Sequence, residues 1–96
     1  INIHPAEVEN LLLACPGVCD AAITAVSDEV WGDRIAALVV GDDIQSIEGW
    51  CRENLPSALR PRLFVSVAAL PRNAMGKLER RRLPALALAV EDQAPC

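Results

Sequence analysis

A single lysine stands out among the residues that could carry chemistry. Lys77 is the only lysine in the 96 residues, and the other eight basic residues are all arginine. It lies in the stretch LPRNAMGKLERRRL, which runs from Leu70 to Leu83. Arginine suits fixed ion pairs and phosphate forks, whereas lysine is a compact charge on a flexible stem that can reach into a reacting centre. The residue type therefore makes Lys77 the first candidate for a functional side chain.

Basic charge is concentrated around this lysine. From Arg52 to Arg82 there are eight basic residues against two glutamates, which gives +6, so the rest of the chain carries −10 within a net charge of −4. A basic segment on an acidic domain favours a local anionic partner over general nucleic-acid binding. A solvated arginine-rich helix face explains the same charges equally well.

The cysteines offer little for metal binding. They form no C-x-x-C pair, and His4 is the only histidine that could join them. Because zinc sites need closely spaced thiolates or imidazoles, we predict no metal site. Cys15 and Cys51 are instead expected to be small buried hydrophobes in a reducing cytoplasm, and the roles of Cys19 and Cys96 stay open.

The chain is long enough for one domain with a core. Apolar residues make up 52% of it, and a domain of this size buries roughly 60–70% of the surface of its unfolded chain. The longest apolar runs, such as Ile35–Val40, fall far short of the roughly 20 residues of a membrane-spanning helix, so we predict no membrane span. The start at Ile1, without a methionine or a leader, indicates a segment cut from a longer protein.

The order of predicted elements indicates a small α+β domain. Pro5 suits the first turn of a helix that Pro16-Gly17 ends, and Asp43 suits the N-cap of a second helix. Runs of β-branched and apolar residues predict three strands, at 18–26, 35–40 and 63–68. The continuous apolar run of the second predicts a central strand that is covered on both faces. We therefore predict an α+β fold with a sheet of about three strands covered by helices.

The sequence predicts three further local features. The polar stretch 27–33 is predicted to form a turn between the first two strands. Gly49 weakens the second helix by roughly 1 kcal/mol relative to alanine, so we expect it to permit close packing. The closing helix is expected to start near Arg81, which puts Pro84 in its first turn, and to give way to a tail near Val90.

Four blocks of sequence, in order, resemble one known family: INIHPAEVE, DEVWGDRIAALVV, WCRENLPSALRPRLF and LPRNAMGKLERRRL. They are similar to the C-terminal domain of the adenylate-forming (ANL) superfamily, which includes acyl- and aryl-CoA synthetases, luciferases and adenylation domains of peptide synthetases. The segment from Pro71 to Arg80 resembles the last core motif of that family, a proline followed by Gly-Lys and then arginine. The resemblance implies a mobile lid at residues 1–88, which starts after the hinge, and a tail at 89–96.

The resemblance also implies roles for the loop around the lysine. Lys77 would enter the active site during adenylation, where a carboxylate attacks the α-phosphate of ATP, and would balance the charge of the two anions. Gly76 would let the loop backbone approach closely, and Asn73 suits the turn. ATP and Mg²⁺ would be bound mainly by the missing N-terminal domain. We expect this chain alone to be inactive.

A second face would serve CoA. The resemblance places Trp31 near the CoA adenine and Arg60 and Arg62 at the nucleotide phosphates, roles that suit a flat aromatic platform and guanidinium forks. Alternatively, Trp31 closes the turn onto the sheet, and Arg60 and Arg62 are solvated. Expected partners are the N-terminal domain, a carboxylic acid of fatty or aromatic acid metabolism, ATP, CoA and a lysine acetyltransferase acting on Lys77, but no nucleic acid.

Two other functions remain open at this point. A lid of the same superfamily could serve the thiol of a carrier protein instead of CoA. Alternatively, the chain could be a non-catalytic binding module whose arginine segment grips a polyanion. Which carboxylic acid is activated does not follow from these residues.

Overall fold

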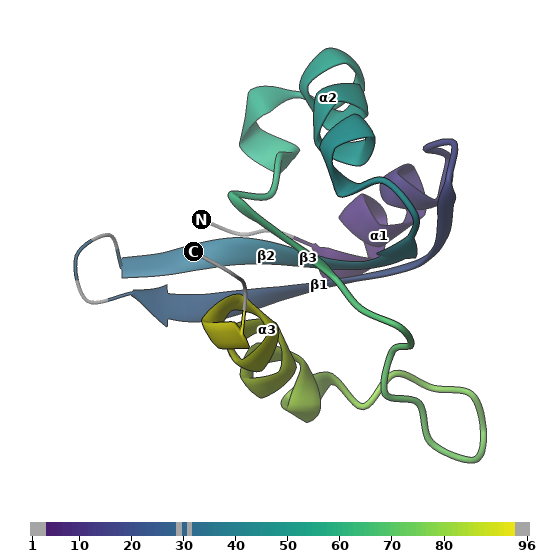
Figure 1. Ribbon diagram of the computed structural model, residues 1–96, viewed down its shortest axis with the longest axis vertical. Helices are drawn as coiled ribbons and strands as arrows, with labels where there is room; N and C mark the ends of the chain where they lie inside the picture. Colours follow the sequence, from purple (N-terminus) through teal and green to yellow (C-terminus); the bar gives the residue numbers. More distant parts are fainter. Residues whose placement is uncertain (1–3, 29, 31, 94–96) are drawn as a thin grey trace.

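The computed structural model describes residues 4–28, 30 and 32–93. Within these ranges the chain forms three α-helices, one three-stranded sheet and two single 3-10 turns (Figure 1). In chain order the elements are α1 (Pro5–Leu13), β1 (Val18–Asp28), β2 (Gly32–Gly41), α2 (Ile44–Asn54), η1 (Ser57–Leu59), β3 (Leu63–Ser66), η2 (Arg80–Arg82) and α3 (Leu83–Gln93).

The sheet has the order β1-β2-β3 and mixes two kinds of pairing. β1 and β2 form an antiparallel hairpin, whereas β3 runs parallel to β2, and α2 makes the crossover between them. The middle strand β2 is buried on both faces from Ala36 to Val39, as its continuous apolar run predicted. The predicted α+β fold with a three-stranded sheet is confirmed.

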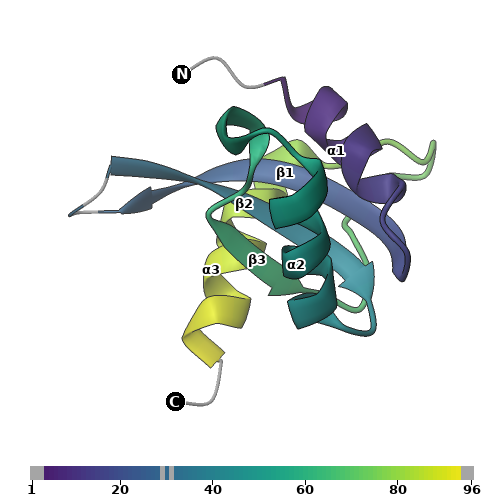
Figure 2. The ribbon, with the colours of Figure 1, turned by 90° about the horizontal axis from the view of Figure 1, so that it is seen from above.

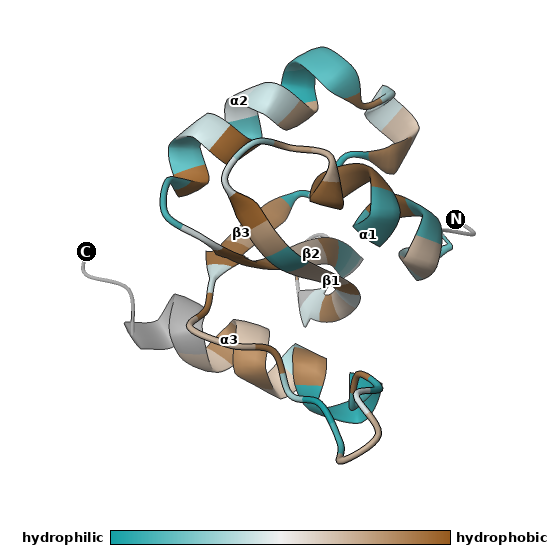
Figure 3. Ribbon diagram, turned by 90° about the vertical axis from the view of Figure 1, so that its right-hand side faces the viewer, coloured by the Kyte–Doolittle hydropathy of each residue, from teal (hydrophilic) through white to brown (hydrophobic). Residues whose placement is uncertain are grey.

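The helices cover both faces of this sheet. α1 and α2 lie on one face, and α3 lies on the other (Figures 1 and 2). Alternate residues of β2 point to opposite layers, so that Ala37 and Val39 pack in the α1–α2 cluster and Ala36 and Leu38 in the α3 cluster. The strands are mostly apolar, whereas the segment that leads into α3 is largely hydrophilic (Figure 3). Among the described helices, none is both long enough and apolar enough to cross a membrane.

Several boundaries differ from those predicted. The stretch 27–33 is not only a turn, because β1 and β2 continue pairing to Asp28 and Gly32, where the hairpin ladder offers their backbone groups partners. β3 ends at Ser66, two residues early. α3 starts at Leu83, directly after η2, so Pro84 lies in its first turn as expected. α3 also continues to Gln93, past the residue where a tail was predicted.

The second helix contains the predicted cap and the glycine whose role was misread. The Asp43 carboxylate accepts the backbone N–H of Ser46 at 3.1 Å, which confirms the N-cap. Gly49, however, does not permit a close approach: a Cβ placed there would meet only the Arg52 guanidinium, at 3.7 Å. The glycine therefore costs helix propensity without a packing benefit.

We expect Gly49→Ala to stabilise the domain by about 0.5–1 kcal/mol, because alanine loses less backbone entropy on entering the helix. Gly41→Ala is the control with the opposite expected effect. It should destabilise the domain, because the alanine Cβ would lie 2.5 Å from the Gly17 carbonyl oxygen. Urea unfolding of the two variants beside the parent chain measures both effects. A Gly49→Ala variant less stable than the parent would contradict the packing seen around α2.

Candidate functional site

The lysine sits at the end of a short loop whose base is closed by backbone pairing. The Glu79 N–H donates to the Pro71 carbonyl at 2.9 Å, and Arg72 and Leu78 form an antiparallel bridge. One step inside, the Asn73 N–H donates to the Lys77 carbonyl at 2.9 Å. Residues 72–78, called the Lys77 loop below, therefore form a defined turn on a paired stem.

The tip of the Lys77 loop is organised by one asparagine and one glycine. The Asn73 side-chain oxygen accepts the backbone N–H groups of Met75 at 2.9 Å and Lys77 at 3.1 Å. Gly76 has a φ of +85°, a left-handed conformation that glycine adopts without steric cost. The residue types at both positions are those that this turn requires.

The lysine side chain is exposed and lies among other cations. Lys77 lines an open depression of about 560 Å³ together with Arg72, Asn73, Leu78 and Arg80. Three of these five side chains carry positive charge. Arg72 and Arg80 are bonded to the carboxylates of Asp20 and Glu9, so the positive charge that this surface offers to an anionic group comes mainly from Lys77.

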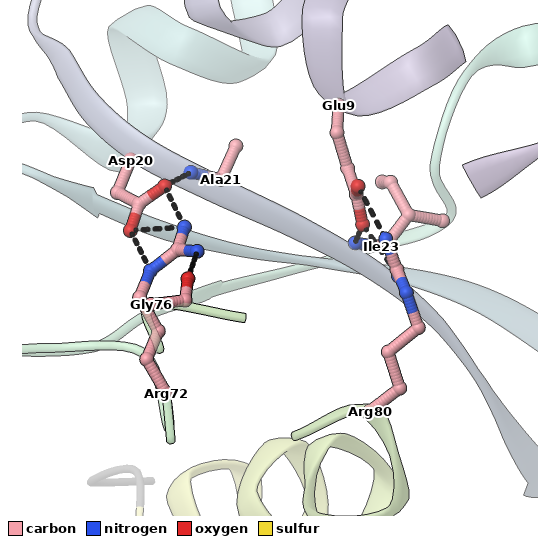
Figure 4. Close-up of polar contacts among 7 residues, drawn as sticks. All are labelled: Glu9, Asp20, Ala21, Ile23, Arg72, Gly76 and Arg80. Carbon is pink, nitrogen blue, oxygen red and sulfur yellow. Dashed lines mark hydrogen bonds and ion pairs between the residues drawn. The ribbon is translucent and has the colours of Figure 1, made fainter. Parts of the chain in front are cut away.

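The Lys77 loop is tied to the sheet by an ion pair that the sequence did not reveal. The Arg72 guanidinium donates to both carboxylate oxygens of Asp20, which lies near the start of β1, with Nη2 at 2.9 Å from each oxygen (Figure 4). Its Nη1 donates to the Gly76 carbonyl at 2.8 Å. One side chain thus links the sheet to the residue before Lys77.

A second ion pair anchors the chain just after the loop. Arg80 forms a two-pronged contact with Glu9 of α1, with both distances 2.9 Å, and the same carboxylate accepts the Ile23 N–H at 2.7 Å (Figure 4). The hydrogen bond with Glu9 raises the pKa of Arg80. Glu9 is only 7% exposed, so a single buried carboxylate joins α1, β1 and η2.

By its place in the sequence, Glu9 suits the positive end of the α1 dipole, but the sequence analysis did not predict the contacts of its side chain. The available signal was its position, next to Val8 and three residues before Leu12, both fully buried in α1. A glutamate on the apolar face of a helix needs a partner. The identity of that partner, 71 positions along the chain, follows only from the tertiary structure.

The residues expected to face CoA lie elsewhere. Arg60 and Arg62 line a pocket of about 390 Å³ with residues of α2 and β3. α2, which contributes to the lining of this pocket, lies on the same side of the sheet as α1, whereas the Lys77 loop lies on the α3 side (Figures 1 and 3). Arg60 is half-buried and its Nε donates to the Leu55 carbonyl at 2.8 Å, while Arg62 is exposed. Trp31 lies outside the described residues.

Comparison with known proteins identifies the family. The family model described as the AMP-binding enzyme C-terminal domain matches residues 7–77, which is most of the chain and ends at Lys77. This chain belongs to that family. The domain is 37% identical over 84 residues to the uncharacterised acyl–CoA ligase YhfT of Bacillus subtilis. The aligned region covers 86% of this chain and 18% of that protein.

Two further relatives of this AMP-binding enzyme C-terminal domain are also a CoA ligase and a CoA synthetase. The 4-chlorobenzoate–CoA ligase of a Pseudomonas species is 40% identical over 88 residues, covering 85% of the chain and 17% of the ligase. The solved structure of a Mycobacterium tuberculosis fatty acyl CoA synthetase superposes with a TM-score of 0.82 at 33% identity, over 93% of the chain and 18% of that protein. The chain thus spans less than a fifth of the length of these relatives.

The described part of the domain offers no cluster of side chains for a metal. No three histidine, cysteine, aspartate or glutamate residues there are grouped so that they could hold an ion.

The expected burial of two cysteines in this domain is confirmed. Cys15 and Cys51 are buried in the α1–α2 cluster, whereas Cys19 is exposed on β1. Burial, helped by the neighbouring Cys15 and Glu48, raises the pKa of the Cys51 thiol to about 11, and burial also raises the pKa of Cys15. The reactive thiolate is therefore scarce at both buried positions near neutral pH.

We expect an alkylating reagent at pH 7.5 to modify Cys19 and to spare Cys15 and Cys51, because the buried pair is both inaccessible and protonated. Peptide mapping by mass spectrometry after a timed reaction reports each position separately. Unfolding in urea before alkylation is the control, and all three should then react. Rapid labelling of Cys51 in the folded domain would contradict its placement in the core.

Proposed function

We propose that this domain is the mobile C-terminal lid of an ATP-dependent acid–CoA ligase. The full-length ligase would form an acyl-adenylate from a carboxylic acid and ATP, then an acyl-CoA thioester with release of AMP. The observation that supports this most is a solitary, exposed lysine on an ordered loop in a domain whose named relatives are CoA ligases. In this proposal the lid comprises residues 1–88 together with the rest of α3, which continues to Gln93.

In the first half-reaction, Lys77 would contact the carboxylate and the α-phosphate as they approach. Both reactants are anionic, so their in-line encounter is opposed by repulsion, and a positioned ammonium group stabilises the charge that develops. The exposure of Lys77 leaves its ammonium free to enter a site in a partner domain. Asn73 and Gly76 would support this role by setting the direction of the loop.

In the second half-reaction, the lid would turn and present its opposite side to CoA. The pocket that Arg60 and Arg62 line carries a third arginine, Arg52 of α2, and α2 lies across the sheet from the Lys77 loop (Figure 1). That separation suits a lid with two working faces, because the lysine leaves the active site when the other face enters. Arg62 is the stronger phosphate ligand in this proposal, because the Nε of Arg60 already bonds the Leu55 carbonyl.

Replacing Arg62 by alanine should raise the KM of the full-length ligase for CoA by about tenfold, the loss expected for one charge-assisted hydrogen bond. The preference for CoA over dephospho-CoA should fall in the same variant if the guanidinium contacts the ribose phosphate. Steady-state thioester assays with both thiols measure this, with Arg81→Ala, an exposed arginine outside the pocket, as the control. An unchanged KM for CoA would remove Arg62 from the thiol site.

The function itself is tested on the full-length protein that contains this domain. Acid-dependent ATP–pyrophosphate exchange followed by thioester formation with CoA supports the ligase. Exchange followed by transfer only to a carrier-protein thiol would favour the superfamily alternative. Salt-sensitive polyanion binding by the isolated 96-residue chain, without exchange activity in the parent protein, would favour a non-catalytic module.

The remaining parts of the proposal concern surroundings and control. The N-terminal domain would make most of the contacts with ATP and Mg²⁺, so the isolated lid would be inactive. The full-length ligase would work in the cytoplasm on a fatty or aromatic acid. Acetylation of Lys77 by a lysine acetyltransferase would remove the charge that adenylation needs. The exposure of Lys77 is compatible with such a modification.

A further inference from the structure

The guanidinium group of Arg72 links the sheet to the Lys77 loop. Arg72 Nη2 lies 2.9 Å from both carboxylate oxygens of Asp20, its Nε lies 3.3 Å from one of them, and its Nη1 donates to the Gly76 carbonyl at 2.8 Å (Figure 4). That carbonyl belongs to the peptide bond between Gly76 and Lys77. The same side chain is therefore hydrogen-bonded both to a residue of β1 and to the peptide bond that precedes Lys77.

The other half of this contact is itself held in place. Asp20 Oδ1 accepts the Ala21 N–H at 3.0 Å, and the residue follows an irregularity in the pairing of β1 with β2, between Val18 and Asp20. The bulge and the local hydrogen bond fix where the carboxylate stands. The other hydrogen bonds described at the tip of the loop join residues 73–77 to one another. They therefore shape the turn without orienting it on the sheet.

The exposure of the pair argues against a role in global stability. The side chains of Arg72 and Asp20 are 38% and 29% exposed, and exposed ion pairs contribute little to the stability of a fold. A two-pronged arginine–carboxylate contact does, however, impose direction as well as attraction. A small rotation of the Lys77 loop on its stem would move a long side chain by ångströms at its tip.

We propose that Arg72 and Asp20 are positioning residues that aim Lys77 during adenylation. They act through the Gly76–Lys77 peptide bond and do not touch the reactants. This inference rests on the proposed function of Lys77 and adds to it a requirement for a rigid loop direction. A misplaced catalytic group about 1 Å from its productive position can slow a reaction by up to about a hundredfold.

The test uses the full-length ligase with the variants Arg72→Ala, Asp20→Ala, the double variant and Lys77→Ala. ATP–pyrophosphate exchange reports adenylation, and thioester formation from a supplied acyl-adenylate reports the second step. We expect each single variant of the pair to lose about tenfold to a hundredfold in exchange and to keep its thioester rate. The double variant should be no slower than Arg72→Ala, because both changes remove one device.

Arg82→Ala is the matched control, because Arg82 forms an exposed ion pair of the same length with Glu79 but makes no bond to the Lys77 loop. Hydrogen–deuterium exchange should rise in a peptide covering residues 73–78 of the Arg72 and Asp20 variants and stay unchanged in the β1–β2 hairpin. That pattern supports the aiming role.

Three results would overturn it. Normal exchange activity in Arg72→Ala and Asp20→Ala, with loss in Lys77→Ala, would show that the lysine needs no brace while leaving the proposed function intact. Equal loss in both half-reactions, or faster hydrogen exchange throughout the domain, would show that the pair supports the fold. Normal activity in Lys77→Ala would remove the proposed role of Lys77 in adenylation, and this inference with it, while the ligase activity itself would stand.

Discussion

Lys77→Ala in the proposed full-length ligase should slow acyl-adenylate formation by about a hundredfold to a thousandfold, the effect of removing one electrostatic contact that stabilises developing charge. Thioester formation from a supplied acyl-adenylate should change little, because the lysine would have withdrawn by then. Measuring the two half-reactions separately gives the comparison. The acid KM in the exchange assay further shows whether the lysine acts in binding or in the reaction step.

The variant series around this position separates charge from shape. Lys77→Arg keeps the charge but adds bulk and a planar head, so we expect partial activity in adenylation. Arg81→Ala removes a nearby exposed cation outside the Lys77 depression and should leave exchange near the parent rate. If Arg81→Ala and Lys77→Ala lost equal activity, the effect would reflect the general positive potential of this surface. If neither half-reaction slowed in Lys77→Ala, the loop would have only a structural role.

Glu9→Ala should destabilise the domain by about 2–3 kcal/mol in urea unfolding. The change removes a carboxylate that is 7% exposed and leaves the buried Ile23 N–H without its acceptor and Arg80 without its partner. An unsatisfied buried donor costs about 1–3 kcal/mol, and breaking an ion pair with one buried partner adds to it. The value lies below that of fully buried pairs, because Arg80 is 48% exposed and solvent screens the contact.

Two companions make this prediction sharper. Glu9→Gln keeps an oxygen that can accept the Ile23 N–H but loses the charge that holds Arg80, so it should cost about half as much as Glu9→Ala. Glu7→Ala, on the exposed side of α1, should change the free energy of unfolding by less than about 0.5 kcal/mol. Equal effects of Glu7→Ala and Glu9→Ala would mean that helix-dipole interactions, and not the buried contacts, account for the loss.

Much of the fold could be predicted from local sequence because its signals are local. The apolar run at Ile35–Val40 predicted a strand covered on both faces, and Asp43 predicted the start of α2. The late start of α3 followed from the fixed backbone of Pro84. The hairpin extension at 27–33 was missed because its polar residues favour a turn locally, whereas pairing with the opposite strand is a long-range term.

The candidate site divides in the same way. Asn73 was expected to suit a turn, because the hydrogen bonds of such a turn join residues close in the chain. The left-handed backbone of Gly76 and the exposure of Lys77 came only from the structure. The roles of these residues and of Arg60, Arg62 and Trp31 in adenylation and CoA binding remain predictions.

By itself the sequence determined the class of fold, the family motifs and the solitary lysine, all of which depend on residue type and short spacing. Only the tertiary structure decided which acidic side chains hold the loop. Asp20 lies 52 positions from Arg72, and Glu9 lies 71 positions from Arg80. With 13 acidic residues available to nine basic ones, charge alone allows many pairings. Among the described residues, chain packing selects Asp20 and Glu9 as the partners from distant parts of the chain.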